Sequence, residues 1–123
     1  MVYDGLIPFE DIVVFPPLLV LLYRPVRSMA IIVGSLHIEM FLSESESLKD
    51  RRRVVKSIMD RLRNKYKVAV ADLSEQPRWR YAEIGVSCVS NSEAHVRDIL
   101  QNVLRFVEGN LYGEIIHQQL EVY

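Results

Sequence analysis

The sequence has almost no cysteine, and this already limits the classes of protein it can belong to. Cys88 is the only cysteine among 123 residues, so no disulfide can form within the chain. It follows Ile84 and Val86 at alternate positions, a pattern that predicts a buried free thiol in a reducing compartment. No spacing of cysteine and histidine indicates a base for a catalytic thiol. We therefore expect a cytoplasmic protein.

The sequence also has no excess charge of either sign. Fifteen Lys and Arg residues face sixteen Asp and Glu residues, which leaves a net charge of -1. This balance excludes a basic tail that coats a polyanion, and a hydrophobic content of 50% excludes intrinsic disorder. The length fits one packed domain.

A long hydrophobic run is absent as well. The longest apolar stretch, residues 12–23, is interrupted by Pro16 and Pro17 and is too short to span a bilayer. Acidic rather than basic residues precede it, which argues against a secretory signal. No membrane partner is expected. Because a strand pattern begins directly after Met29, we interpret residues 1–28 as an over-extended start and 29–123 as the domain. The alternative is an apolar arm that packs on a partner or a membrane surface.

From residue 29 onward, apolar side chains follow the periods of strands and helices in turn. Alternate positions over 32–42 are apolar, which predicts a half-buried strand. Residues 67–73, 81–90 and 114–123 are expected to form three more strands, with Pro77 in the turn between the first two of them.

Two segments between these strands have helical periodicity instead. Ser47 and Asp50 fit a capping box at the start of the first helix. The second helix is expected to be capped by Ser90 or Asn91 and to end at Gly109 in a left-handed conformation. The apolar stripes consist of Leu48, Val55, Ile58, Met59, Leu62 and Tyr66 in the first helix, and of Val96, Ile99, Leu100, Val103 and Val107 in the second.

The order of these elements is β-α-β-β-α-β. Right-handed crossovers then place both helices on one face of an antiparallel sheet with strand order 4-1-3-2, which is a ferredoxin-like α+β sandwich. The other sheet face is left open to a ligand, a nucleic acid or a second copy of the chain.

Charge is unevenly divided along this domain. Residues 48–67 hold nine basic and two acidic residues, a charge of +7, and the remainder of 29–123 carries -7. Five of the basic residues share a sector of about 100° on the first helix, and we call them the basic stripe. The basic stripe consists of Lys49, Arg52, Arg53, Lys56 and Arg63.

The basic stripe can follow a phosphate backbone. It can equally be a solvated helix face, with Asp60 pairing with Lys56 and Arg63, or a contact with an acidic patch on a partner. Arg51 is different because it projects near the apolar stripe. We expect it to extend its charge to the surface or to pair with a carboxylate, in a structural role.

A second cluster, Arg78, Trp79 and Arg80, lies in the turn before the third strand. A base stacked on Trp79 with phosphates on the two arginines would make this turn part of an RNA site. Alternatively, Trp79 is a lid on the sheet or the anchor of a homodimer. The strand that follows lacks the aromatic RNP1 pattern, which argues against base stacking on the sheet.

Histidines offer a weaker signal. His37 and His117 are expected on neighbouring strands of the open face, with Glu39 nearby, but no fixed-spacing motif supports a metal site. We interpret them as surface polar residues and expect no catalytic residue, metal or cofactor. Gly34 and Gly85 form no phosphate-binding loop.

Several segments together resemble the YlxP-like family of small bacterial proteins, a domain of unknown function. The resemblance implies a ferredoxin-like fold, a cytoplasmic location and no established enzyme activity. The family's gene neighbourhood among translation and ribosome-maturation factors implies a link to RNA or ribosomes. The family has no agreed active site to carry over. The matching segments are residues 47–56 (SLKDRRRVVK), residues 60–64 (DRLRN), Trp79, Gly85-Val86 and Ser90-Asn91.

Two functional hypotheses follow. The first is a non-enzymatic accessory protein that contacts RNA or the ribosome through the basic stripe, assisted by Arg78, Trp79 and Arg80. The second is a homodimeric module that senses a small molecule or binds a protein through the open sheet face.

Overall fold

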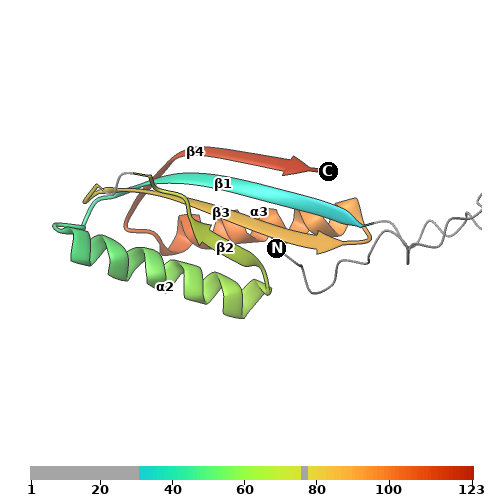
Figure 1. Ribbon diagram of the computed structural model, residues 1–123, viewed down its shortest axis with the longest axis horizontal. Coiled ribbons are helices and arrows are strands. Elements are labelled where there is room, and N and C mark those ends of the chain that lie inside the picture. The colour runs from blue at the N-terminus through green and yellow to red at the C-terminus, as the bar shows by residue number, and fades with distance from the viewer. Residues whose placement is uncertain (1–30, 76–77) are drawn as a thin grey trace, which may run out of the picture.

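The computed structural model describes residues 31–75 and 78–123 (Figure 1). The interpretation of residues 1–28 and the turn position of Pro77 lie outside these ranges. The described elements follow one another as β1 (Ile32–Leu42), α2 (Leu48–Tyr66), β2 (Ala69–Asp72), β3 (Tyr81–Ser90), α3 (Glu93–Asn110) and β4 (Gly113–Val122).

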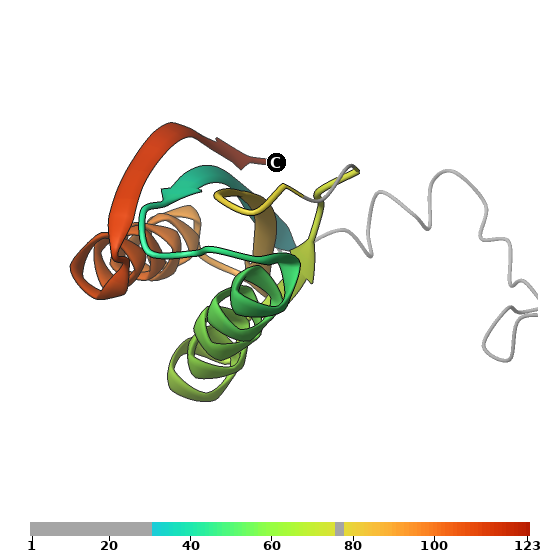
Figure 2. The same ribbon diagram turned by 90° about the vertical axis from the view of Figure 1, so that its left-hand side faces the viewer.

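The four strands form one antiparallel sheet in the order β2-β3-β1-β4. Counted from the other edge, this is the predicted order 4-1-3-2. Figure 2 shows α2 and α3 side by side on the same face of the sheet. The predicted ferredoxin-like α+β fold is therefore confirmed. No helix within the described parts of the chain is long and apolar enough to cross a membrane.

The core lies between the helices and the covered face of the sheet. In β1, Leu36, Ile38 and Met40 are at most 1% exposed, while the residues between them face the open side. The predicted half-buried strand is thus confirmed. Gly34 lets α3 approach β1, because a Cβ atom there would collide with Val96 Cγ1. The remaining buried apolar side chains are Leu42, Val55, Ile58, Leu62, Val68, Val70, Ala82, Ile84, Val86, Val96, Leu100, Val103 and Val107.

The start of α2 matches the prediction closely. Ser47 is the N-cap, and its Oγ accepts a hydrogen bond from the Asp50 backbone N–H at 3.0 Å. The Asp50 carboxylate accepts the return bond from the N–H of Glu46, one residue earlier than in a capping box. The helix ends at Lys67, which adopts the left-handed conformation and delays the start of β2 to Ala69.

Both predicted ends of α3 are wrong. Its N-cap is Ser92, because Ser90 is still paired with Ile32 in the sheet and its Oγ accepts a bond from the Ser92 N–H. At the other end, the helix continues through Gly109 to Asn110. The positive φ expected of Gly109 is absent, since Leu111 leaves the helix in an extended conformation toward β4.

Candidate functional site

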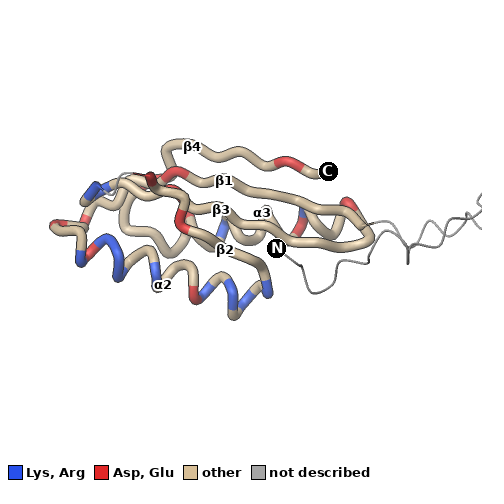
Figure 3. Tube along the Cα trace, in the orientation of Figure 1, with Lys and Arg blue, Asp and Glu red and all other residues tan. Residues whose placement is uncertain are grey.

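The basic stripe lies along α2, where Figure 3 shows most of the described Lys and Arg residues. All five of its side chains are exposed. Lys49, Arg52 and Arg53, at the N-terminal end, form no hydrogen bond or ion pair with any other described side chain. These three cations are available to a partner.

The C-terminal part of the stripe is partly neutralised. Lys56 Nζ lies 2.8 Å from the Asp60 carboxylate, and Arg63 Nη1 lies 3.3 Å from it. Arg63 also donates to the carbonyl of Val70 at 2.8 Å. The hydrogen bond from Lys56 holds the pKa of Asp60 below its usual value, and Arg63 contributes to the same shift. The predicted pairing with Asp60 is confirmed, so the stripe is strongest near its start.

Arg51 has the structural role that the sequence predicts. Its side chain is only 4% exposed, and its Nε donates to the carbonyl of Tyr81 at 2.9 Å. Its Nη2 donates to the Asp72 carboxylate at 3.2 Å and to Ser74 Oγ at 2.6 Å. The hydrogen-bond partners of the buried Arg51 guanidinium thus come from β2, β3 and the loop between them. Arg51 is not part of the exposed basic surface.

The turn residues are divided between two places. Arg80 Nε donates to the carbonyl of Ser45 at 3.2 Å, which holds the turn beside the start of α2. Arg78 instead lines a hollow of about 480 Å³ together with Glu75, Tyr81 and Glu83. Arg80 therefore extends the N-terminal end of the basic stripe, whereas Arg78 lies beside acidic residues.

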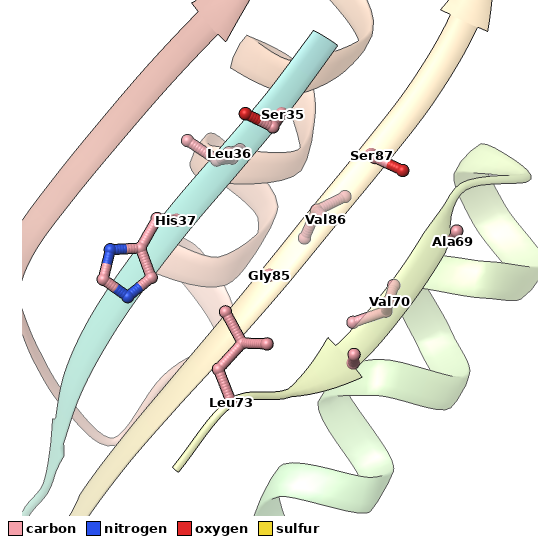
Figure 4. A pocket seen from close by; sticks show the side chains of 10 residues that line it. Ser35, Leu36, His37, Ala69, Val70, Leu73, Gly85, Val86 and Ser87 are labelled. Atoms are coloured by element: carbon pink, nitrogen blue, oxygen red, sulfur yellow. The ribbon is translucent and has the colours of Figure 1, made fainter. Parts of the chain in front are cut away.

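Trp79 is 57% exposed. Leu73, which is 44% exposed, is the side chain that lies against the sheet at Gly85. A Cβ atom at Gly85 would lie 2.8 Å from Leu73 Cδ1, so the close approach of the Leu73 side chain to the strand favours glycine at this position. Between Leu73 and His37, a shallow depression of about 420 Å³ opens on the sheet, with Gly85 at its floor (Figure 4).

The open sheet face carries a row of polar side chains next to this depression. We call His37, Glu39, Glu83 and His117 the polar row. Glu39 is the register partner of Glu83 on β3 and of His117 on β4. His37 Nε2 lies 3.7 Å from the Glu83 carboxylate, and the rings of His37 and His117 are 6.1 Å apart. The predicted proximity of the two histidines is confirmed. Glu83 was missed, although its alternation with Tyr81 and Ser87 already placed it on the polar side of the strand.

Tyr81 closes this row at one end. Its hydroxyl donates to Glu83 Oε1 at 2.7 Å, and this bond, together with the negative charge of Glu39 and Glu83, raises the pKa of Tyr81 well above its usual value. Tyr81 therefore remains a neutral hydrogen-bond donor at physiological pH.

Cys88 is half-buried rather than fully buried, and burial raises the pKa of its thiol. The thiol thus stays protonated at neutral pH, in agreement with an unreactive cysteine. His95, on α3, has a partner that the sequence did not indicate: its Nδ1 lies 3.2 Å from Ser90 Oγ.

Comparison of the sequence with known proteins identifies the family to which the chain belongs. The chain is 32% identical over 76 residues to the uncharacterized protein YlxP of Bacillus subtilis (strain 168), an alignment that covers 62% of this chain and 83% of YlxP. Comparison with solved structures also found two designed proteins of low similarity. Ferredog-Diesel has 18% identity and a TM-score of 0.39 over 72% of this chain and 83% of its own. Foldit4 has 16% identity and a TM-score of 0.42 over 76% and 94%.

The model of the family described as "Protein of unknown function (DUF503)" matches residues 33–120. This range contains α2 with its basic stripe and the polar row of the open face. The match also agrees with the resemblance found in residues 47–64. The chain therefore belongs to the DUF503 family, and YlxP is a relative of the chain.

Proposed function

We propose that this protein is a non-enzymatic accessory factor that binds RNA through the N-terminal half of the basic stripe. The observation that supports the proposal is the group Lys49, Arg52 and Arg53: three exposed cations on one helix face with no counter-ion among the described residues. Arg80, held beside the same helix end, adds a fourth positive charge, and exposed Trp79 offers a surface for stacking.

The arrangement suits a phosphate backbone better than a small anion. A helix rises about 1.5 Å per residue, so Lys49, Arg52 and Arg53 are spread over about 6 Å of the helix axis, and the stripe continues for about 20 Å in all. The cations are therefore spaced along a line rather than converging on one point. Such a line neutralises successive phosphates and releases their counter-ions, which makes binding depend steeply on salt. For three contacts to single-stranded RNA, log K should fall with a slope of about -2 against log salt.

Fluorescence anisotropy of a labelled ribosomal RNA fragment, measured over a salt series, tests the proposal. We expect Lys49→Gln/Arg52→Gln/Arg53→Gln to weaken binding at low salt and to flatten the salt slope. The control is Arg97→Gln/Arg105→Gln on α3, which removes two exposed cations outside the stripe, one of them paired with Glu93, and should change little. Equal binding by the wild type and the triple variant would refute the proposal.

A second candidate function is self-association through the open sheet face. It is favoured by three exposed apolar residues at one end of that face: Val33, Val89 and Tyr123. Val33 is the register partner of Val89, and Tyr123 exchanges two backbone hydrogen bonds with Val33, so the three lie side by side. Such a patch suits a dimer contact, and light scattering at high salt distinguishes it from association through charge, because salt screens only the latter.

A further inference from the structure

The polar row on the open face brings metal-binding atoms together. His37, Glu39 and Glu83 each offer one ligand atom, and these three atoms lie within 4.8 Å of one another. They come from the central strands β1 and β3, which hold them on a rigid base. His117 stands beside them on β4, opposite Glu39.

The charges in this cluster are not balanced by the protein. Glu39 and Glu83 are direct register partners, and like charges in that position destabilise a sheet. Within the described residues, no Lys or Arg lies within 4 Å of either carboxylate, and Arg78 only lines the neighbouring hollow. The groups that do approach are His37 and the Tyr81 hydroxyl, which donates to one oxygen of Glu83.

The surroundings also suit a bound cation. The side chains of His37 and Glu83 are 33% and 26% exposed, so the site is partly shielded from water yet open for an ion to enter. Tyr81 fixes the orientation of the Glu83 carboxylate in the way that outer-shell partners orient metal ligands. The second oxygen of Glu83 remains directed toward His37.

We propose that His37, Glu39 and Glu83 bind one divalent transition metal ion. Mixed imidazole and carboxylate ligands favour ions of intermediate softness such as Zn²⁺ over Mg²⁺ or Ca²⁺, which take oxygen ligands alone. Atoms bound to one tetrahedral Zn²⁺ are about 3.3 Å apart, given bonds of about 2 Å. His37 Nε2 and Glu83 Oε2 lie 3.7 Å apart, which is already close to that distance. His117, whose ring centroid lies 6.1 Å from that of His37, is a candidate for the fourth ligand.

This site is independent of the proposed RNA-binding surface. The ligands face the side of the sheet that the helices leave open, whereas the basic stripe lies on α2 beyond the other face (Figure 2). Either proposal can therefore fail while the other stands.

The test uses protein prepared without a His-tag. Titration with Co²⁺, followed by visible absorption, and competition with Zn²⁺ should show one saturable site per chain. We expect His37→Gln and Glu83→Gln each to weaken binding at least about tenfold. His95→Gln, which removes an exposed histidine outside the cluster, is the matched control and should leave the affinity unchanged.

A thermal measurement separates loss of the site from loss of the fold. Zn²⁺ should raise the melting temperature of the wild type and of His95→Gln, but not that of folded His37→Gln or Glu83→Gln. Circular dichroism identifies which variants are folded, and Glu39→Gln serves as a third ligand variant. Absence of saturable binding, equal affinity in the wild type and ligand variants, or an equal response to Mg²⁺ would overturn the proposal.

Discussion

Three consecutive arginines, Arg51 to Arg53, have two different environments in this protein. Successive helix residues are rotated by about 100°, so one of the three turns toward the sheet and two turn to solvent. The buried guanidinium of Arg51 replaces its lost hydration with bonds to Tyr81, Asp72 and Ser74. A buried cation of this kind is costly when its counter-ion is removed, which makes Asp72 important although it is partly exposed.

We predict that Asp72→Asn lowers the free energy of unfolding at pH 7 by about 1–2 kcal/mol, a value reduced by the partial exposure of the carboxylate. Burial alone raises the pKa of Asp72, but hydrogen bonds from Ser74 and the charge of Arg51 outweigh it, so the pKa lies below 3.8. Because the folded pKa is depressed, the carboxylate stabilises the fold fully above 3.8. Its contribution disappears as the pH falls through the lower, folded value.

Urea unfolding at several pH values checks this prediction. The difference between the wild type and Asp72→Asn should be greatest near pH 7 and should shrink as the pH falls below 3.8 through the depressed pKa of folded Asp72. Asp98→Asn is the control, because Asp98 is exposed and accepts no hydrogen bond from another described side chain. A difference that is the same at every pH would show that the ion pair is not responsible.

At the scale of elements, the ends of α3 depend on the sheet. Ser92 caps the helix by accepting a hydrogen bond from the His95 N–H at 3.3 Å. Ser92→Ala should therefore destabilise the protein by about 1 kcal/mol, whereas Asn91→Ala should have an effect of a few tenths. Thermal or urea unfolding of both variants measures the difference. If Asn91→Ala is the more damaging change, the cap lies one residue earlier than the structure places it.

The strands and helices follow from local patterns, but their ends do not. Alternation over 81–90 and the stripe through Val96 and Val107 are properties of single segments, so they can be recognised without knowing the neighbours. Ser90, by contrast, is kept in β3 by Ile32, a residue 58 positions earlier in the chain. A cap prediction from sequence cannot include that pairing.

The same contrast between local pattern and long-range pairing decides which candidate site could be predicted from the sequence. The basic stripe lies within one helix and was predicted in full, as was the partnership of Lys56 and Arg63 with Asp60. The polar row needs the register of three strands, and only that register places Glu83 opposite Glu39. His37 and His117 were expected to be close because strand order alone made their strands neighbours.

For the molecule as a whole, positive charge is concentrated on α2, whereas acidic residues are spread over the other elements and the start of that helix. The basic stripe of α2 faces away from the sheet, while Glu39 and Glu83 lie on the open face and Glu114 and Glu121 on the edge strand β4 (Figure 3). The net charge of -1 therefore conceals a charge of +7 over residues 48–67, and the surface is not uniformly neutral. Such a molecule is attracted to polyanions by one side and to its own copies by both.

We predict weak self-association at low ionic strength, with the basic stripe of one molecule against the acidic side of another. The Debye length is about 30 Å at 10 mM salt and about 8 Å at 150 mM, so the attraction should disappear over this range. Static light scattering should show a mean mass that rises as salt is removed, and Lys49→Gln/Arg52→Gln/Arg53→Gln should abolish the rise. The control Arg97→Gln/Arg105→Gln should retain most of it.

A dimer that persists unchanged at 150 mM salt and in the triple variant would contradict this prediction. Such a dimer would favour contact through Val33, Val89 and Tyr123, because burial of apolar surface is not screened by salt.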